Sequence, residues 1–97
     1  MNLIYSFSQA YPDNSGEVKV SLYGKRVVIE RSSYEGVREK CVIAIRSLQS
    51  FSLEYPDETR NTRFHLEFNR REGASFWNEG DIKEKLEKFI EHLEKII

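Results

Sequence analysis

The sequence predicts a mainly β (α+β) fold, in which about seven short antiparallel strands form a bent sheet or small barrel and one amphipathic helix follows at about 81–97. Three observations predict it. Up to Gly80, apolar residues alternate with polar ones, which is the period of a strand with one buried face. After Gly80, apolar residues recur at the 3.6-residue period of a helix. No helical segment separates the strands, so a parallel doubly wound sheet is excluded.

Length and composition indicate one soluble domain spanning 1–97. A chain of 97 residues has material for one core. Charged residues make up 32% and hydrophobic residues 39%, and the net charge of −1 excludes a basic field over the whole chain. No apolar run approaches the ~20 residues of a membrane span, and the N-terminus lacks the pattern of a signal peptide. With Cys41 as the single cysteine, an internal disulfide is impossible, and we expect a cytoplasmic protein without a membrane partner.

The first strand is predicted at 3–8, where apolar residues alternate. Residues 11–16, with the letters YPDNSG, have the composition of a loop. A loop of this kind between two alternating segments predicts an antiparallel pair.

The next two strands, at about 17–23 and 26–32, form a predicted hairpin. Gly24-Lys25 fits a two-residue type II′ turn with glycine first. This turn places Val20 opposite Ile29 on one face, and Lys19 opposite Glu30 on the other. A shift by one residue would lose both matches, so the register is well determined.

Two strands are predicted in the middle of the chain. Residues 34–39 form a loop around Gly36, and a strand with two largely apolar faces follows at 41–46. A cleaner alternation at 51–55 predicts another strand, which Pro56 ends.

The last two strands form a second predicted hairpin. Residues 71–73, Arg-Glu-Gly, suit a three-residue loop with glycine in the left-handed position. That loop places Phe68 opposite Phe76 and puts Trp77 beside Glu67 on the outer face.

The C-terminal helix has the strongest signal in the sequence. Asp81 is a candidate N-cap and Glu84, three residues later, completes a capping box. Two glutamate–lysine pairs four residues apart, Glu84–Lys88 and Glu91–Lys95, support the helix. The apolar stripe, which we expect to pack on the sheet, consists of Ile82, Leu86, Phe89, Ile90, Leu93, Ile96 and Ile97. The two terminal isoleucines finish the core or leave a patch for self-association into a homo-oligomer.

Three segments resemble the pleckstrin-homology-like domains, especially the short bacterial members. Residues 16–20 and 26–29 look like the second and third strands of that family, and residues 41–51 look like its centre. The resemblance implies a seven-stranded bent sheet or barrel with a C-terminal helix. Phosphoinositide-binding members carry basic residues in the first loop, whereas residues 9–16 contain none. We therefore expect no phosphoinositide binding.

The cysteine and the histidines of this chain do not form a catalytic or metal-binding pattern. A nucleophile needs a nearby base, but Cys41 begins an apolar strand and His65 falls on the polar side of another. A structural zinc site usually needs four Cys or His ligands, and only His92 adds to these two. The sequence therefore predicts no enzyme activity, no catalytic residues, no cofactor and no metal.

Charge is unevenly distributed along the chain, which indicates a candidate binding surface. Residues 1–18 carry a net charge of −2, residues 19–71 carry +4 and residues 72–97 carry −3. Arginines bracket the second hairpin, and Trp and Arg are the residue types most enriched at interface hot spots. The candidate partner-binding residues are Trp77, Arg70, Arg71, Arg63 and Arg60. Trp77 has two interpretations: it projects from the outer face, or it wedges under the first turn of the helix.

By elimination, these observations favour a non-catalytic protein-interaction domain, a small cytosolic adaptor, regulator or inhibitor that acts through its surface on another protein. The alternative is single-stranded nucleic-acid (RNA) binding through the Arg-rich hairpin near residues 60–71. That alternative is disfavoured because the phenylalanines fall on inward faces, so few aromatic rings remain for base stacking.

Overall fold

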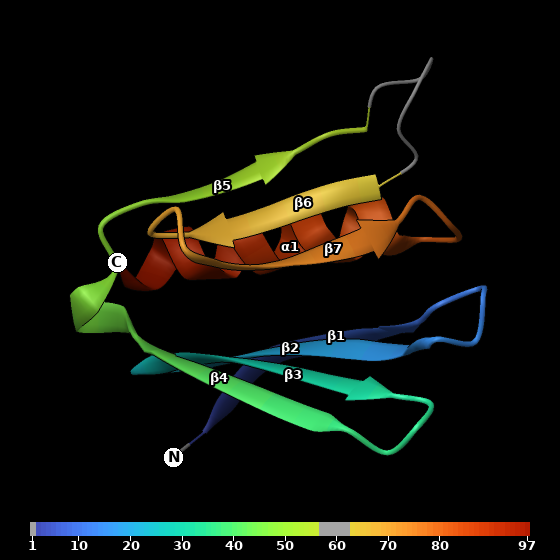
Figure 1. Ribbon diagram of the computed structural model, residues 1–97. Helices are drawn as coiled ribbons and strands as arrows, with labels where there is room; N and C mark the ends of the chain where they lie inside the picture. Colours follow the sequence, from blue (N-terminus) through green and yellow to red (C-terminus); the bar gives the residue numbers. More distant parts are fainter. Residues whose placement is uncertain (1, 57–62) are drawn as a thin grey trace.

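The structure, a computed structural model, describes residues 2–56 and 63–97, which form seven antiparallel strands in two sheets and one C-terminal helix (Figure 1). The four-stranded sheet has the order β1 (Leu3–Ala10), β2 (Gly16–Tyr23), β3 (Arg26–Ser33) and β4 (Arg38–Ala44). A short 3₁₀ turn, η1 (Ile45–Ser47), leads to the second sheet, with the order β5 (Phe51–Glu54), β6 (Arg63–Phe68) and β7 (Glu72–Trp77). The helix α1 (Ile82–Ile96) lies behind β6 and β7. The predicted fold class is therefore confirmed.

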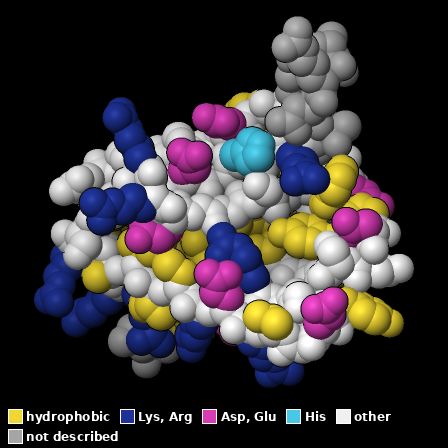
Figure 2. Space-filling model, viewed as in Figure 1, with side chains coloured by type: hydrophobic (Ala, Val, Ile, Leu, Met, Phe, Trp, Pro, Cys, Tyr) yellow, Lys and Arg dark blue, Asp and Glu magenta, His cyan; other side chains and the backbone are white. Residues whose placement is uncertain are grey.

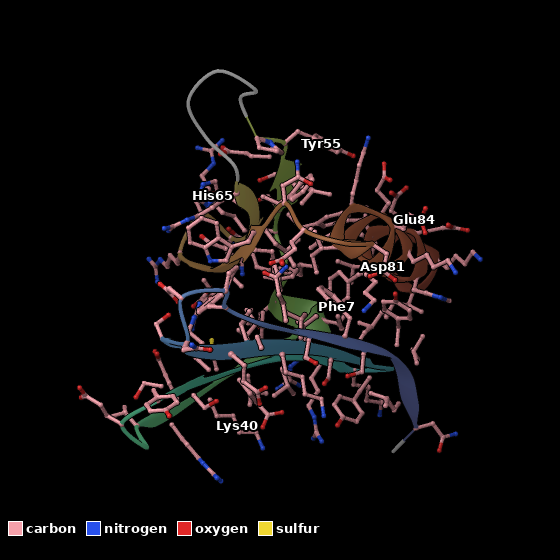
Figure 3. The ribbon with its side chains drawn as sticks, turned by 90° about the vertical axis from the view of Figure 1, so that its right-hand side faces the viewer. Phe7, Lys40, Tyr55, His65, Asp81 and Glu84 are labelled. Atoms are coloured by element: carbon pink, nitrogen blue, oxygen red, sulfur yellow. The ribbon has the colours of Figure 1, made fainter. Side chains whose placement is uncertain are left out.

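One hydrophobic core lies between the two sheets and α1. Phe7 of β1 is central to it: its ring centroid lies 5.2 Å from that of Phe76 and 5.8 Å from that of Phe89 (Figure 3). Phe89, Leu86 and Leu93 of the helix are fully buried. The alternation in the strands and the 3.6-residue stripe of the helix thus bury their apolar sides in the same volume.

The register of the β2–β3 hairpin is as predicted. Val20 pairs with Ile29 and Lys19 with Glu30. The predicted type II′ turn is wrong, because Gly24 is not among the residues with positive φ. Burial of the apolar face on both strands determines the pairing without that turn.

The strand after this hairpin begins earlier than predicted. β4 starts at Arg38, because the chain turns within 34–37 rather than over the whole predicted loop. The Ser33 N–H donates to the Val37 carbonyl at 2.8 Å, and Gly36 takes a φ of 89°. This tight turn leaves Arg38 free to pair with β3.

The register of the β6–β7 hairpin differs from the prediction. Phe76 pairs with Phe64 rather than with Phe68. The turn residues with left-handed φ are Asn69 (53°) and Arg70 (58°), not Gly73. Positive φ at two successive residues is the pattern of a type I′ hairpin turn, so the chain reverses before the predicted loop.

Gly73 does not form part of the turn; it allows the backbones of β6 and β7 to approach each other closely. It lies within β7, where a Cβ atom would collide with the carbonyl oxygen of Leu66 on the paired strand. A glycine inside a strand can mark either a close backbone approach or a bend, and the alternation of apolar residues does not distinguish the two.

The helix begins at Ile82, and its N-terminus lacks the predicted capping box. Asp81 makes no side-chain cap hydrogen bond. Its carboxylate instead lies 3.4 Å from the Lys85 ammonium. The predicted Glu91–Lys95 pair is present at 3.8 Å. No helix in the described part of the chain is long and apolar enough to cross a bilayer.

The two sheets do not close into a barrel, because side chains rather than a strand meet the outer edge of β7. The Gln9 side-chain amide exchanges two hydrogen bonds with the backbone of Trp77, at 2.9 and 2.7 Å. Tyr11 donates to the Ser75 carbonyl at 3.3 Å. These contacts leave a seam between β7 and the four-stranded sheet.

Candidate functional site

A polar groove of about 420 Å³ lies along this seam, between the outer face of β6–β7 and the side chains that reach across from the other sheet. We call it the seam groove. Basic and hydroxyl side chains dominate its lining, together with two glutamates. The polar lining residues are Tyr11, Arg31, Arg63, His65, Glu67, Arg70, Arg71, Glu72 and Ser75.

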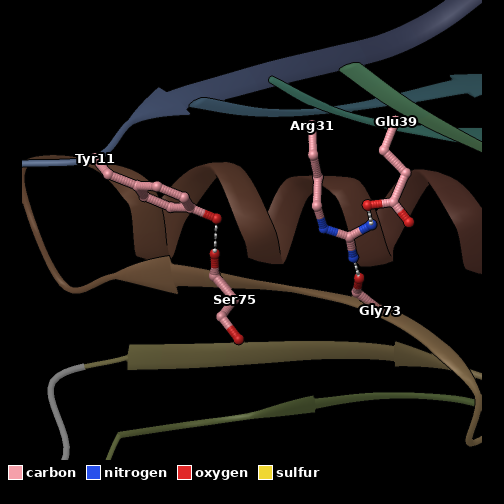
Figure 4. A network of polar contacts seen from close by, with 5 residues as sticks. All are labelled: Tyr11, Arg31, Glu39, Gly73 and Ser75. Atoms are coloured by element: carbon pink, nitrogen blue, oxygen red, sulfur yellow. Dashed lines mark hydrogen bonds and ion pairs between the residues drawn. The ribbon is translucent and has the colours of Figure 1, made fainter. Parts of the chain in front are cut away.

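The wall of the seam groove is built by a network that spans the two sheets (Figure 4). Arg31 of β3 donates to the Gly73 carbonyl, and its guanidinium lies 3.8 Å from the Glu39 carboxylate on β4. Tyr11 and Arg31 therefore occupy carbonyls of β7 that a further strand would otherwise take. An edge strand whose hydrogen-bonding groups are occupied resists pairing with a further strand, so the groove presents side chains rather than free backbone at these positions.

Trp77 lies on the outer face of the second sheet, as one of the two sequence interpretations holds. It is half-buried and pairs with Arg63 across the hairpin. The guanidinium of Arg63 lies 4.4 Å from the centre of the indole ring, which is cation–π geometry. The neighbouring residue Phe76 faces the core and α1. Trp77 therefore does not wedge under the helix.

The described arginines among the candidate partner-binding residues are distributed along the whole groove. Arg63 lies against the indole, whereas Arg70 and Arg71 lie at the turn that precedes β7, at the opposite end of that strand. The predicted register, with Phe68 opposite Phe76, would place Trp77 nearer to the turn with Arg70 and Arg71; in the observed register Trp77 lies opposite Arg63, away from that turn. All three arginines are exposed and line the seam groove. Arg60 lies outside the described residues.

Arg31, which lines the groove, and Gln9, which bonds the backbone of Trp77, were not predicted from the sequence. Both occupy inward-facing positions of their strands, two residues after Ile29 and Phe7 respectively. A polar side chain that continues a buried apolar row is the signal that could have identified them. The position of their acceptors, about forty or more residues further along the chain, depends on how the sheets pack.

His65 and Cys41 are not assembled as a nucleophile and base. His65 is on the outer face of β6, on the side opposite to α1 (Figure 3), and its Nδ1 lies 2.8 Å from the Ser75 hydroxyl. Cys41 is on β4 in the other sheet. Burial, and next the nearby Glu72, raise the pKa of the Cys41 thiol, which reduces the thiolate fraction at neutral pH. In the described ranges, no three Cys, His, Asp or Glu side chains are arranged to hold a metal ion.

Positive charge predominates in the seam groove although the chain as a whole is slightly acidic. Four arginines face two glutamates in the lining. Figure 2 shows basic side chains interspersed with acidic ones on the face that is visible in Figure 1. Burial raises the pKa of Tyr11, and the nearby Arg31 and Arg63 oppose this shift because they favour the phenolate. The groove therefore presents a neutral tyrosine hydroxyl among guanidinium groups.

Comparisons with protein-family models, curated proteins and solved structures find no match for this chain. The geometry of the seam groove is therefore the basis for the functional argument.

Proposed function

We propose that this chain is a non-catalytic protein-interaction domain, a small adaptor, regulator or inhibitor of the cytoplasm that binds another protein through the seam groove. The observation that carries the proposal is the Arg63–Trp77 pair. Arg63 lines one end of the groove and Trp77 lines a smaller pocket that shares Arg63 with it, while the other end of the groove displays two further exposed arginines. A large aromatic ring next to directed guanidinium donors is the composition of interface hot spots.

The division into four strands, three strands and a terminal helix supports the resemblance to pleckstrin-homology-like domains, which stays a proposal. The lone, half-buried Cys41 fits a reducing compartment.

Single-stranded nucleic-acid binding is the competing function. The arginines of the groove favour it, but Phe64, Phe68 and Phe76 are buried. Of the aromatic rings that a base could stack on, Trp77 already carries the Arg63 guanidinium on its ring. A sheet that binds RNA displays several free rings, so the protein partner is favoured.

The proposal is tested by capture from the cells that naturally contain the protein. Tagged wild type is compared with the double variant Arg63→Gln/Arg71→Gln, and with Lys25→Gln/Lys88→Gln, which removes two charges from exposed positions outside the groove. We expect a protein recovered by the wild type and the lysine variant and lost by the arginine variant. Recovery that does not depend on the arginines, or recovery of nucleic acid alone, contradicts the proposal.

Absence of phosphoinositide binding is a separate prediction. The loop after β1 contains Asp13, whose carboxylate accepts a hydrogen bond from the Ser15 N–H at 2.9 Å, and no lysine or arginine. Headgroup phosphates require basic donors, so the protein should stay in the supernatant when liposomes that contain phosphoinositides are sedimented. Salt-sensitive pelleting, above the level with neutral liposomes, would show that the loop is not decisive.

A further inference from the structure

We infer that the seam groove recognises an acidic, extended segment of a partner protein, and that Arg70 is kept at the β6–β7 turn for this contact at the expense of fold stability. The inference rests on the proposed function and adds the chemistry of the partner.

Arg70 has a backbone conformation that its side chain disfavours. Its φ of 58° lies in the left-handed region, which glycine adopts without strain and which a long side chain disfavours. The preferred sequence for two successive left-handed residues in a hairpin is Asn-Gly, whereas this chain has Asn69-Arg70. The turn requires the left-handed conformation but not an arginine side chain, and residues held in such sparsely populated conformations cluster at functional sites.

The side chains of the two left-handed residues of this turn differ in their contacts. The Asn69 carboxamide oxygen accepts the Gln49 N–H at 2.6 Å and the Ser50 N–H at 3.2 Å, so this side chain ties the turn to the connection before β5. Arg70 has no corresponding role. In the part of the chain that the structure describes, its exposed side chain makes no hydrogen bond or ion pair. Its guanidinium is therefore available to a ligand.

The charge of the groove determines which ligand fits. Arg70 and Arg71 occupy one end and Arg63 the other, on the same side of the molecule as Arg31. Arginine presents a planar fork of donors that matches a carboxylate in two parallel hydrogen bonds. A segment that carries carboxylates near both ends of the groove satisfies this arrangement.

The acids among the arginines favour a peptide over a nucleic acid. Glu67 and Glu72 line the same groove, and Asp13 lines, together with Trp77, the smaller pocket that shares Arg63 with it. A phosphate backbone repeats its negative charge at every nucleotide and meets these carboxylates, whereas a peptide can place neutral residues opposite them. The Tyr11 hydroxyl, which donates to the Ser75 carbonyl, keeps lone pairs that can accept a hydrogen bond from such a neutral segment.

The test measures binding and stability of the same variants. The probe is a short labelled peptide of alternating glutamate and glycine, compared by fluorescence anisotropy with its lysine–glycine counterpart and with labelled oligothymidylate. We expect the wild type to bind the acidic peptide and to lose affinity as salt screens the arginines. Arg70→Gly should weaken binding by about three- to tenfold and raise Tm by about 2–5 °C, because glycine relieves the left-handed strain.

Two controls separate charge from strain. Arg70→Lys keeps the charge and the strain, so Tm should stay at the wild-type value and part of the affinity should remain. Lys88→Gln, on the exposed side of α1, should change neither quantity.

Three results overturn the inference. Tighter binding of oligothymidylate that Arg70→Gly abolishes identifies a nucleic-acid site. A stabilised Arg70→Gly variant with unchanged peptide affinity shows that the arginine is not used. If the acidic peptide does not bind while capture still depends on Arg63 and Arg71, the acidic partner is wrong and the proposed function stands; if arginine-dependent capture is also absent, both fail.

Discussion

The registers of the two hairpins β2–β3 and β6–β7 are determined by different features of the chain. In β2–β3 the register follows from the side chains, and the turn contributes little: Gly24 does not take the positive φ that its position in a type II′ turn requires. In β6–β7 the turn decides the register, through the left-handed Asn69 and Arg70. The comparison teaches that alternation identifies which face is buried, and that it determines the register only where the cross-strand pairs distinguish one register from another; elsewhere the turn decides.

The cross-strand pairs explain why alternation of apolar residues was sufficient to predict the register of one hairpin and not of the other. In β2–β3, a shift by one residue breaks both the apolar pair Val20–Ile29 and the charge pair Lys19–Glu30, and a shift by two still separates Lys19 from Glu30. In β6–β7, the inward positions of β6 are Phe64, Leu66 and Phe68, and Phe76 matches the first and the last of them equally well by polarity. A shift by an even number of residues keeps every side chain on its face, so polarity alone does not distinguish the two registers.

The largest expected difference between the hairpins is in their buried pairs. Phe76→Ala should reduce the free energy of unfolding by about 3–5 kcal/mol, because it removes a fully buried ring that packs on Phe7. Val20→Ala in the other hairpin removes a smaller side chain and should cost about 2–3 kcal/mol. Urea denaturation measures both. A Phe76→Ala loss below about 1 kcal/mol would mean that β6–β7 is peripheral to the core.

The two glycines provide the sharpest comparison. Gly73→Ala should reduce stability by about 2–4 kcal/mol, since the added methyl group meets the backbone carbonyl of Leu66. Gly24→Ala should change it by less than about 0.5 kcal/mol, because no atom lies within 4 Å of the new methyl group. The matched variants differ in one methyl group at each site. Losses of similar size at the two sites would support the turn positions that the sequence predicts, because a positive φ at both glycines would disfavour alanine at both.

Each hairpin also carries one cation–π pair, and the two pairs test the environment of the single tryptophan. Arg63→Ala should increase acrylamide quenching of Trp77 and lower the free energy of unfolding by about 0.5–1 kcal/mol, because the guanidinium covers the ring. The control is Arg26→Ala, which removes the cation 4.7 Å from the centre of the Tyr23 ring and should leave the quenching unchanged. Equal quenching in both variants would mean that Arg63 does not shield the indole.

The smallest expected effect concerns the outer face of β2–β3. Lys19 and Glu30 are exposed and paired in register, but no ion pair within 4 Å joins them among the described residues. Lys19→Gln should therefore change the free energy of unfolding by less than about 0.5 kcal/mol in thermal or urea denaturation. A larger loss would show that this charge pair, and not only the apolar face, holds the register.

The candidate site could be predicted only in part. Trp77 and the arginines were identifiable as interface residue types, and the outer face of Trp77 follows from alternation within β7. Their mutual arrangement was not identifiable, because it depends on a hairpin register and on two sheets that approach each other side by side. Gln9, Tyr11 and Arg31 contact β7 across that seam, and no local pattern records which carbonyl each of them reaches.

The sequence by itself determined the strands, the helix and the buried side of each, because the periods of two and 3.6 residues are properties of the backbone that apolar side chains follow. It also determined the register of β2–β3, where two kinds of pairing agree. The tertiary structure alone decided that the sheets stay open at β7, that side chains of β1 and β3 cover this edge, and that arginines distant in the sequence share one groove. The physical reason is that burying the large rings of Phe7, Phe76 and Phe89 in one core sets the distance and angle between the sheets, and the polar side chains then bond to whatever backbone that packing brings within reach.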